Sequence, residues 1–169
     1  MENESNGPLS QNYFLQPGFI YLATEPTIIS TVVGSSIAIC VFDRKQKIGG
    51  MNHFQFPVIR SKEQATSRYG NVAVSALINL MINEGSKFEY LEVQILGGAY
   101  HPEVLNENVG LENIKVTKKI LTKKNLIVSE DVGGEKGQKI IFNTNTNEIA
   151  VVKVDKVRQE DWYPYEIKE

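Results

Sequence analysis

The 169-residue chain has few of the residues that build metal sites and cross-linked folds. Its single cysteine, Cys40, excludes an internal disulfide, and His53 and His101 are too far apart in sequence to form a zinc-ligand motif with it. No apolar run approaches the roughly 18 residues of a membrane span, and the N-terminal residues lack the basic start and apolar stretch of a signal peptide. We therefore expect a cytoplasmic protein with no metal, no cofactor and no membrane insertion.

A charge excess of either sign is also absent. The chain has 18 Lys and Arg residues against 20 Asp and Glu residues, which gives a net charge of -2. This balance provides no positive field to attract nucleic acid, so we expect no nucleic-acid partner. The content of 41% apolar and 22% charged residues is that of an ordinary globular protein, and the length fits one domain.

The sequence divides into three parts. Residues 1–17 are polar and show no period, so we interpret them as a mobile N-terminal arm. Residues 18–154 carry the periodic segments of a single domain. Residues 155–169 form a C-terminal tail that contains Trp162, Tyr163 and Tyr165.

Within the domain, apolar spacing predicts two helices and several strands. Helical spacing covers residues 70–84, where Gly85 supplies the stop, and about 112–124. Apolar, β-branched or alternating segments predict strands at residues 27–33, 37–42, 48–54, 91–96, 126–130, 139–142 and 148–154. Cys40 lies in one of these buried strands, and we interpret it as a small hydrophobic residue.

The hairpin formed by residues 37–42 and 48–54 brings Ser36 close to His53 in sequence register. Ser36 faces His53 if the turn is centred between Arg44 and Lys45, and faces Phe54 if the turn is centred on Lys45. A slip of one residue would place the two side chains on opposite faces. The sequence therefore predicts that the backbones are close and leaves the side-chain contact open.

Residues 31–43 read TVVGSSIAICVFD and residues 49–54 read GGMNHF. A hydroxyl on a tight turn, an imidazole on the adjacent strand and nearby backbone amides are the groups that acyl transfer requires. The alternative is that Gly34–Ser36 is only a turn and that His53 is a hydrogen-bonded interior histidine.

These segments resemble the CheD family of bacterial chemoreceptor glutamine deamidases. The resemblance covers roughly residues 18–154. It rests on Thr31, Gly34, Ser35, Ser36, Ala38, Cys40, Asp43, the Gly49–His53 segment, Pro57, Arg68–Gly70, Gly97–Ala99, Gly110, Asn113, Asp131, Gly133, Gly134, Gly137 and Phe142. It implies a layered β-sandwich with flanking helices, an α/β (α+β) fold of one domain.

The resemblance also implies a reaction and its residues. The family uses a Cys-His pair assisted by a Thr to hydrolyse receptor glutamine side chains, so His53 is the implied base and Thr31 the implied orienting residue. Ser36 stands in place of the catalytic cysteine. Glu112 and Gln138 are further departures from the family pattern.

Two functional hypotheses follow from the resemblance. In the first, the chain is a working deamidase with serine as a slower nucleophile. In the second, it is a catalytically silent module that docks on chemotaxis receptors or regulates a CheC-type phosphatase. The implied partners are methyl-accepting chemotaxis receptors and a CheC-type phosphatase.

Overall fold

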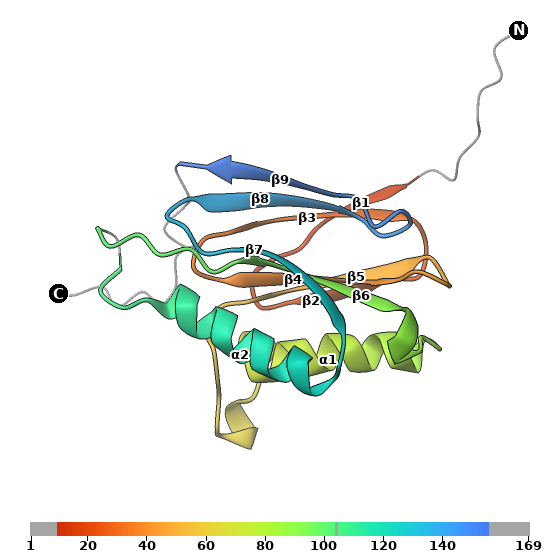
Figure 1. The fold of residues 1–169 in the computed structure, drawn as a ribbon, viewed down its shortest axis with the longest axis horizontal. Helices are drawn as coiled ribbons and strands as arrows, with labels where there is room; N and C mark the ends of the chain where they lie inside the picture. The colour runs from red at the N-terminus through yellow and green to blue at the C-terminus, as the bar shows by residue number, and fades with distance from the viewer. Residues whose placement is uncertain (1–9, 104, 156–169) are drawn as a thin grey trace, which may run out of the picture.

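The part of the chain that the structure describes, residues 10–103 and 105–155 of a computed structural model, folds into three layers (Figure 1). In chain order the described elements are β1 (Gln11–Phe14), β2 (Ile20–Ala23), β3 (Thr27–Val33), β4 (Ile37–Asp43), β5 (Ile48–Phe54), η1 (Lys62–Gln64), α1 (Gly70–Asn83), η2 (Phe88–Tyr90), β6 (Leu91–Gly97), α2 (Val109–Lys123), β7 (Ile127–Val132), β8 (Gly137–Asn143) and β9 (Ile149–Val154).

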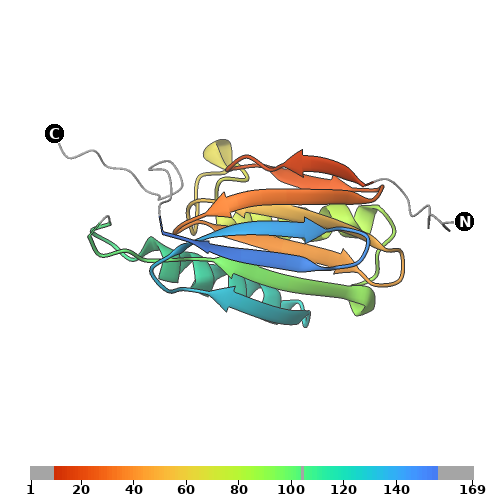
Figure 2. The ribbon, with the colours of Figure 1, turned by 90° about the horizontal axis from the view of Figure 1, so that it is seen from above.

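The strands form two sheets that lie on each other. The outer sheet has the order β1-β3-β8-β9, and the inner sheet has the order β2-β5-β4-β6-β7. The pairs β1/β3 and β6/β7 are parallel and the other pairs are antiparallel. Viewed from above, the outer sheet covers the inner one, and α1 and α2 lie beneath both (Figure 2). The predicted single-domain α+β fold with flanking helices is confirmed.

Strand β4 is the middle strand of the inner sheet, and both of its faces are buried. Ile37, Ile39 and Val41 face the helices and pack with the apolar residues of α1 and α2. The alternate residues, which include Ala38 and Cys40, face the outer sheet. Burial on both faces explains why this strand is a continuous apolar run. The interpretation of Cys40 as a buried hydrophobic residue is confirmed, and its burial raises the pKa of the thiol.

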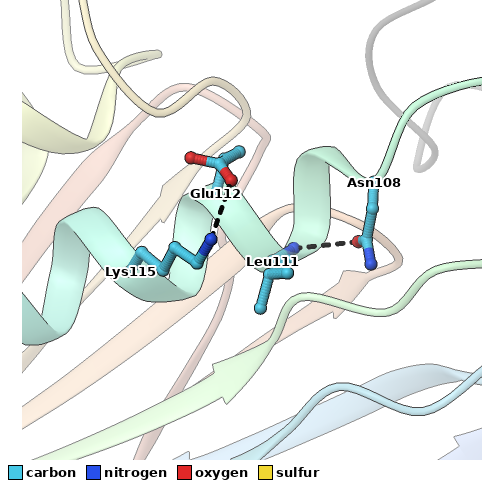
Figure 3. Close-up of polar contacts among 4 residues, drawn as sticks. All are labelled: Asn108, Leu111, Glu112 and Lys115. Atoms are coloured by element: carbon cyan, nitrogen blue, oxygen red, sulfur yellow. Dashed lines mark hydrogen bonds and ion pairs between the residues drawn. The ribbon is translucent and has the colours of Figure 1, made fainter.

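Both predicted helices are present. α1 ends before Gly85, which has a φ of +94°. α2 begins three residues earlier than the apolar spacing predicts, because Asn108 caps it: its side-chain oxygen accepts a 3.0 Å hydrogen bond from Leu111 N–H (Figure 3). In the same view, Lys115 and Glu112 form an exposed 3.2 Å ion pair, which contributes little to stability.

Strand β1 was not predicted from the sequence pattern. β1 lies within residues 1–17, the segment that the sequence predicts to be an arm, yet it pairs in parallel with β3 and is followed by the fully buried Leu15. All four β1 side chains are exposed, so the strand has no alternation that a sequence pattern could reveal. Residues 1–9 lie outside the described residues, as do residues 156–169 with Trp162, Tyr163 and Tyr165.

None of the helices in the described part of the chain has the length and apolar character needed to cross a membrane.

Candidate active site

The turn Gly34–Ser36 carries the chain from β3 in the outer sheet to β4 in the inner sheet. Two of its carbonyl oxygens accept hydrogen bonds from the segment after β6: Ala99 N–H donates to Gly34 O and Gly98 N–H donates to Ser36 O, both at 2.9 Å. Gly97 has a φ of +101°, and a Cβ at this position would overlap the Ser36 carbonyl oxygen. Glycine is therefore required here for the close approach of the two segments.

The register of the β4–β5 hairpin is neither of the two that the sequence left open. Ala38, not Ser36, lies opposite His53. The turn is centred between Lys45 and Gln46, since Asp43 pairs with Ile48. The Asp43 carboxylate holds this turn by accepting hydrogen bonds from Lys45 N–H and Gln46 N–H at 2.8 and 3.0 Å. His53 consequently shares a face with Ala38, the face that is directed at the outer sheet.

Between the two sheets, the side chains of Ser36, His53 and Thr31 form a chain of hydrogen bonds. Ser36 Oγ lies 2.9 Å from His53 Nε2, and His53 Nδ1 lies 2.8 Å from Thr31 Oγ1. Thr31 comes from β3 in the outer sheet, whereas His53 comes from β5 in the inner sheet. The structure thus brings together all three residues that the family resemblance implied.

The direction of these bonds sets the tautomer of His53. The Thr31 hydroxyl donates its one proton to the Leu15 carbonyl oxygen at 2.9 Å, so toward His53 it can act only as an acceptor. We infer that His53 Nδ1 carries the proton and that Nε2 has a free lone pair. Nε2 then accepts the Ser36 hydroxyl proton, which is the arrangement a general base requires.

The backbone around His53 is held by the segment that precedes β2. Gly18 N–H donates to His53 O at 2.7 Å, and His53 N–H donates to Phe19 O at 3.1 Å. Sequence reasoning missed these residues and Leu15, because they act through backbone atoms that leave no side-chain signal. Among these residues, only Gly18 offered a signal in the sequence, because glycine often marks a backbone position with positive φ, and its φ is +87°.

The site is closed to solvent in this structure. Ser36 and His53 have no exposed surface, and Thr31 is 1% exposed. Burial lowers the pKa of His53 from the ordinary 6.5 to about 3, and both hydrogen-bond partners of its ring are neutral hydroxyls. His53 is therefore neutral at neutral pH, as a base must be. The imidazolium that forms when His53 accepts a proton is disfavoured at this buried position. A substrate must displace covering atoms to reach the Ser36 hydroxyl.

A hollow of about 350 Å³ adjoins the site at Gly98, the residue whose amide binds Ser36 O. Its other lining residues include Tyr100, Leu111, Ile114 and Glu135. Leu111 is 43% exposed, so the hollow presents an apolar contact to solvent.

The buried histidine predicts a pH-dependent stability. Because the pKa of His53 is about 3 in the folded state and 6.5 without burial, the unfolded chain binds more protons between these values. The contribution of His53 to the free energy of unfolding is full above pH 6.5 and decreases as the pH falls toward 3, by at most about 1.4 kcal/mol per pH unit. Urea denaturation between about pH 4 and 6 should give a shallower pH dependence for His53→Gln. Equal slopes for the two proteins would contradict this assignment.

Comparison with known proteins decides the family. Residues 57–153, more than half of the chain, match the family model described as CheD chemotactic sensory transduction. The chain belongs to the CheD family. The match begins after His53, so the three candidate site residues lie outside it.

Several curated CheD relatives are similar over a longer stretch. The chain is 33% identical over 147 residues to a probable chemoreceptor glutamine deamidase CheD of Sulfurimonas denitrificans, an alignment that covers 85% of this chain and 94% of the relative. A CheD of Trichlorobacter lovleyi with the same description is 33% identical over 155 residues, covering 88% of this chain and 94% of the relative. A CheD 1 of Anaeromyxobacter dehalogenans is 35% identical over 147 residues, covering 85% of each chain.

Proposed function

We propose that this CheD family member hydrolyses glutamine side chains of chemotaxis receptors to glutamate, at a low rate. Ser36 is the nucleophile, His53 the base and Thr31 the orienting residue. The observation that carries the proposal is the hydrogen-bond chain from Ser36 through His53 to Thr31, with Nε2 free to accept a proton. The substrate class comes from the names of the relatives, which are chemoreceptor glutamine deamidases.

The proposed reaction has two stages. Ser36 Oγ attacks the carboxamide carbon while its proton passes to His53 Nε2, and the resulting intermediate expels ammonia after His53 returns that proton to the leaving nitrogen. A water molecule then attacks the ester on Ser36, with His53 again taking the proton. Glutamate leaves and the serine hydroxyl is restored. The balance is one water consumed and one ammonia released, so the reaction requires no cofactor.

Two features make this reaction slow. A serine hydroxyl loses its proton far less readily than a thiol, whose ordinary pKa is about 8.5. The proton must also be held by His53, and burial opposes the charged imidazolium. Thr31 offers an oxygen but no carboxylate to offset that charge.

The receptor is expected to approach over the hollow beside Gly98. This hollow adjoins the carbonyl of Ser36 and is lined by exposed apolar surface at Leu111. A receptor helix that docks there would place a glutamine side chain next to the turn Gly34–Ser36. A CheC-type phosphatase is proposed to bind the same face, in competition with the receptor.

A second candidate function is a silent CheD-type binding module. The observation that favours it is that the nucleophile position holds a serine whose side chain is completely buried. In this case the chain docks on receptors or regulates a CheC-type phosphatase without turnover.

The test is mass spectrometry of a receptor cytoplasmic fragment incubated with the protein. Each deamidation raises the fragment mass by about one unit, because NH₂ is replaced by OH. We expect a slow mass increase that Ser36→Ala abolishes, and we expect Ser36→Ala to bind the fragment as tightly as the unmodified protein. Binding is measured by calorimetry at micromolar concentrations.

The surface variant Leu111→Asp should weaken receptor binding at least about tenfold, which corresponds to roughly 1.4 kcal/mol. Lys119→Asp is the control, because Lys119 is exposed on the same helix and does not line the hollow. Binding without any mass increase would favour the silent module. Absence of both binding and a mass increase would contradict both functions.

A further inference from the structure

Asn113 connects helix α2 to both halves of the candidate site. Its side chain is completely buried, and Nδ2 donates hydrogen bonds to Ser35 O at 2.9 Å and to Gln55 O at 3.1 Å. Ser35 directly precedes the nucleophile Ser36, and Gln55 follows the base His53 by two residues. One amide group therefore holds the segment that carries the nucleophile and the segment that carries the base.

The orientation of this amide is fixed by its partners. Both acceptors are backbone carbonyl oxygens, so the NH₂ group must face them and Oδ1 must point elsewhere. Oδ1 is buried and has no hydrogen-bond partner among the described residues. A buried, unpaired acceptor is unfavourable by about 1–3 kcal/mol. Asn113 therefore stabilises the fold through the two hydrogen bonds that its NH₂ group donates, and not through its carbonyl oxygen.

The turn needs such a contact because the pairing of β4 with β5 does not include it. Ser36 precedes the first paired residue of β4, so the β4–β5 register fixes Ala38 opposite His53 but leaves Ser36 outside the ladder. Within the turn, the Gly34 and Ser36 carbonyls are held by backbone amides of the segment after β6, and the Ser35 carbonyl is held by Asn113. Of these three contacts, the one from Asn113 also reaches the segment that follows His53.

We propose that Asn113 is a positioning residue that sets the distance between Ser36 Oγ and His53 Nε2. It does so by holding the Ser35 and Gln55 carbonyls at one nitrogen atom. The inference rests on the proposed function for its catalytic meaning, since a nucleophile is useful only within reach of its base. The effect of Asn113 on the distance between Ser36 and His53 does not depend on turnover.

The test measures the Ser36–His53 hydrogen bond directly, by ¹⁵N NMR of protein labelled at histidine. Ser36→Ala removes the donor to His53 Nε2 and gives the Nε2 signal of a ring without this bond. We expect Asn113→Ala to move the His53 Nε2 signal most of the way to the Ser36→Ala value. Asn113→Ser, which keeps a single, shorter donor, should give an intermediate shift and provides a second variant if Asn113→Ala does not fold.

Thr117→Ala is the matched control. Thr117 is also completely buried on α2, and its hydroxyl donates a 2.8 Å hydrogen bond to Asn113 O, but it contacts neither Ser35 nor Gln55. The control should leave the His53 signal at the position of the unmodified protein. An unchanged signal in both Asn113 variants, or an equal shift in Thr117→Ala, would overturn the proposal.

A kinetic measurement in the Ser36→Cys background separates this inference from the proposed function. There, Asn113→Ala should reduce kcat for receptor deamidation about 100-fold with little change in KM, because a displacement near 1 Å affects the attack more than docking. A shifted NMR signal without deamidation in any variant would support the positioning role and contradict the enzymatic function. Equal kcat values with and without Asn113 would overturn the positioning role.

Discussion

Ser36→Cys is expected to raise the rate of receptor glutamine deamidation by several powers of ten. The scaffold already places a neutral imidazole nitrogen with a free lone pair 2.9 Å from the side-chain oxygen at this position. A thiol at the same place gives up its proton more readily than the serine hydroxyl and is the stronger nucleophile. Loss of one member of such a catalytic unit commonly reduces rates by several powers of ten, so restoring the thiol should recover a comparable factor.

The comparison requires three proteins assayed on one receptor fragment by mass spectrometry. They are the unmodified chain, Ser36→Cys, and Ser36→Cys combined with His53→Ala. Cys40 should not act as a second nucleophile in this assay, because it is buried in strand β4 and burial raises the pKa of its thiol. Equal rates for the serine and cysteine forms, both well above the double variant, would show that serine is a competent nucleophile. No activity in any form would contradict the expectation.

The layers of the fold could be predicted from the sequence because they depend on side-chain periodicity. β4 reads as a continuous apolar run, and it is buried on both faces. β1 could not be predicted, because its four exposed side chains carry no pattern and its pairing with β3 uses backbone atoms alone. The hairpin register depended on a loop conformation in which Asp43 caps two amides and Lys47 has a φ of +57°. Local composition does not specify that conformation.

The candidate site could likewise be predicted from the sequence only in part. Thr31, Ser36 and His53 could be named from the family resemblance, and the structure brings their side chains together. The Leu15 carbonyl, which sets the direction of the whole hydrogen-bond chain, could not be named because any residue would supply it. Asn113 lies 78 residues from Ser35 and 58 from Gln55, and contacts at such separations are determined only by the packed fold.

Gly110→Ala is expected to destabilise the protein by about 3 kcal/mol, although alanine is the better helix former by about 1 kcal/mol. Gly110 lies in the first turn of α2, where a Cβ would be 2.5 Å from the Ala99 carbonyl oxygen and 2.6 Å from the Gly98 carbonyl carbon. These are backbone atoms that cannot rotate away. The N–H groups of the same two residues hold the Gly34 and Ser36 carbonyls. Relief of the clash must therefore move either the nucleophile turn or the helix that carries Asn113.

Urea denaturation of Gly110→Ala and Gly134→Ala separates this clash from the general effect of replacing glycine. Gly134 has a φ of +73°, and a Cβ added there would have no atom within 4 Å, so alanine meets only backbone strain of about 1–2 kcal/mol. The same methyl group is added at both positions, and the surrounding atoms differ. A Gly110→Ala protein as stable as the unmodified chain would contradict the close contact between α2 and the Gly98–Ala99 segment. Gly110→Ala should also shift the ¹⁵N signal of His53 Nε2, because movement of the turn or of Asn113 alters the hydrogen bond between Ser36 and His53, whereas Gly134→Ala should not.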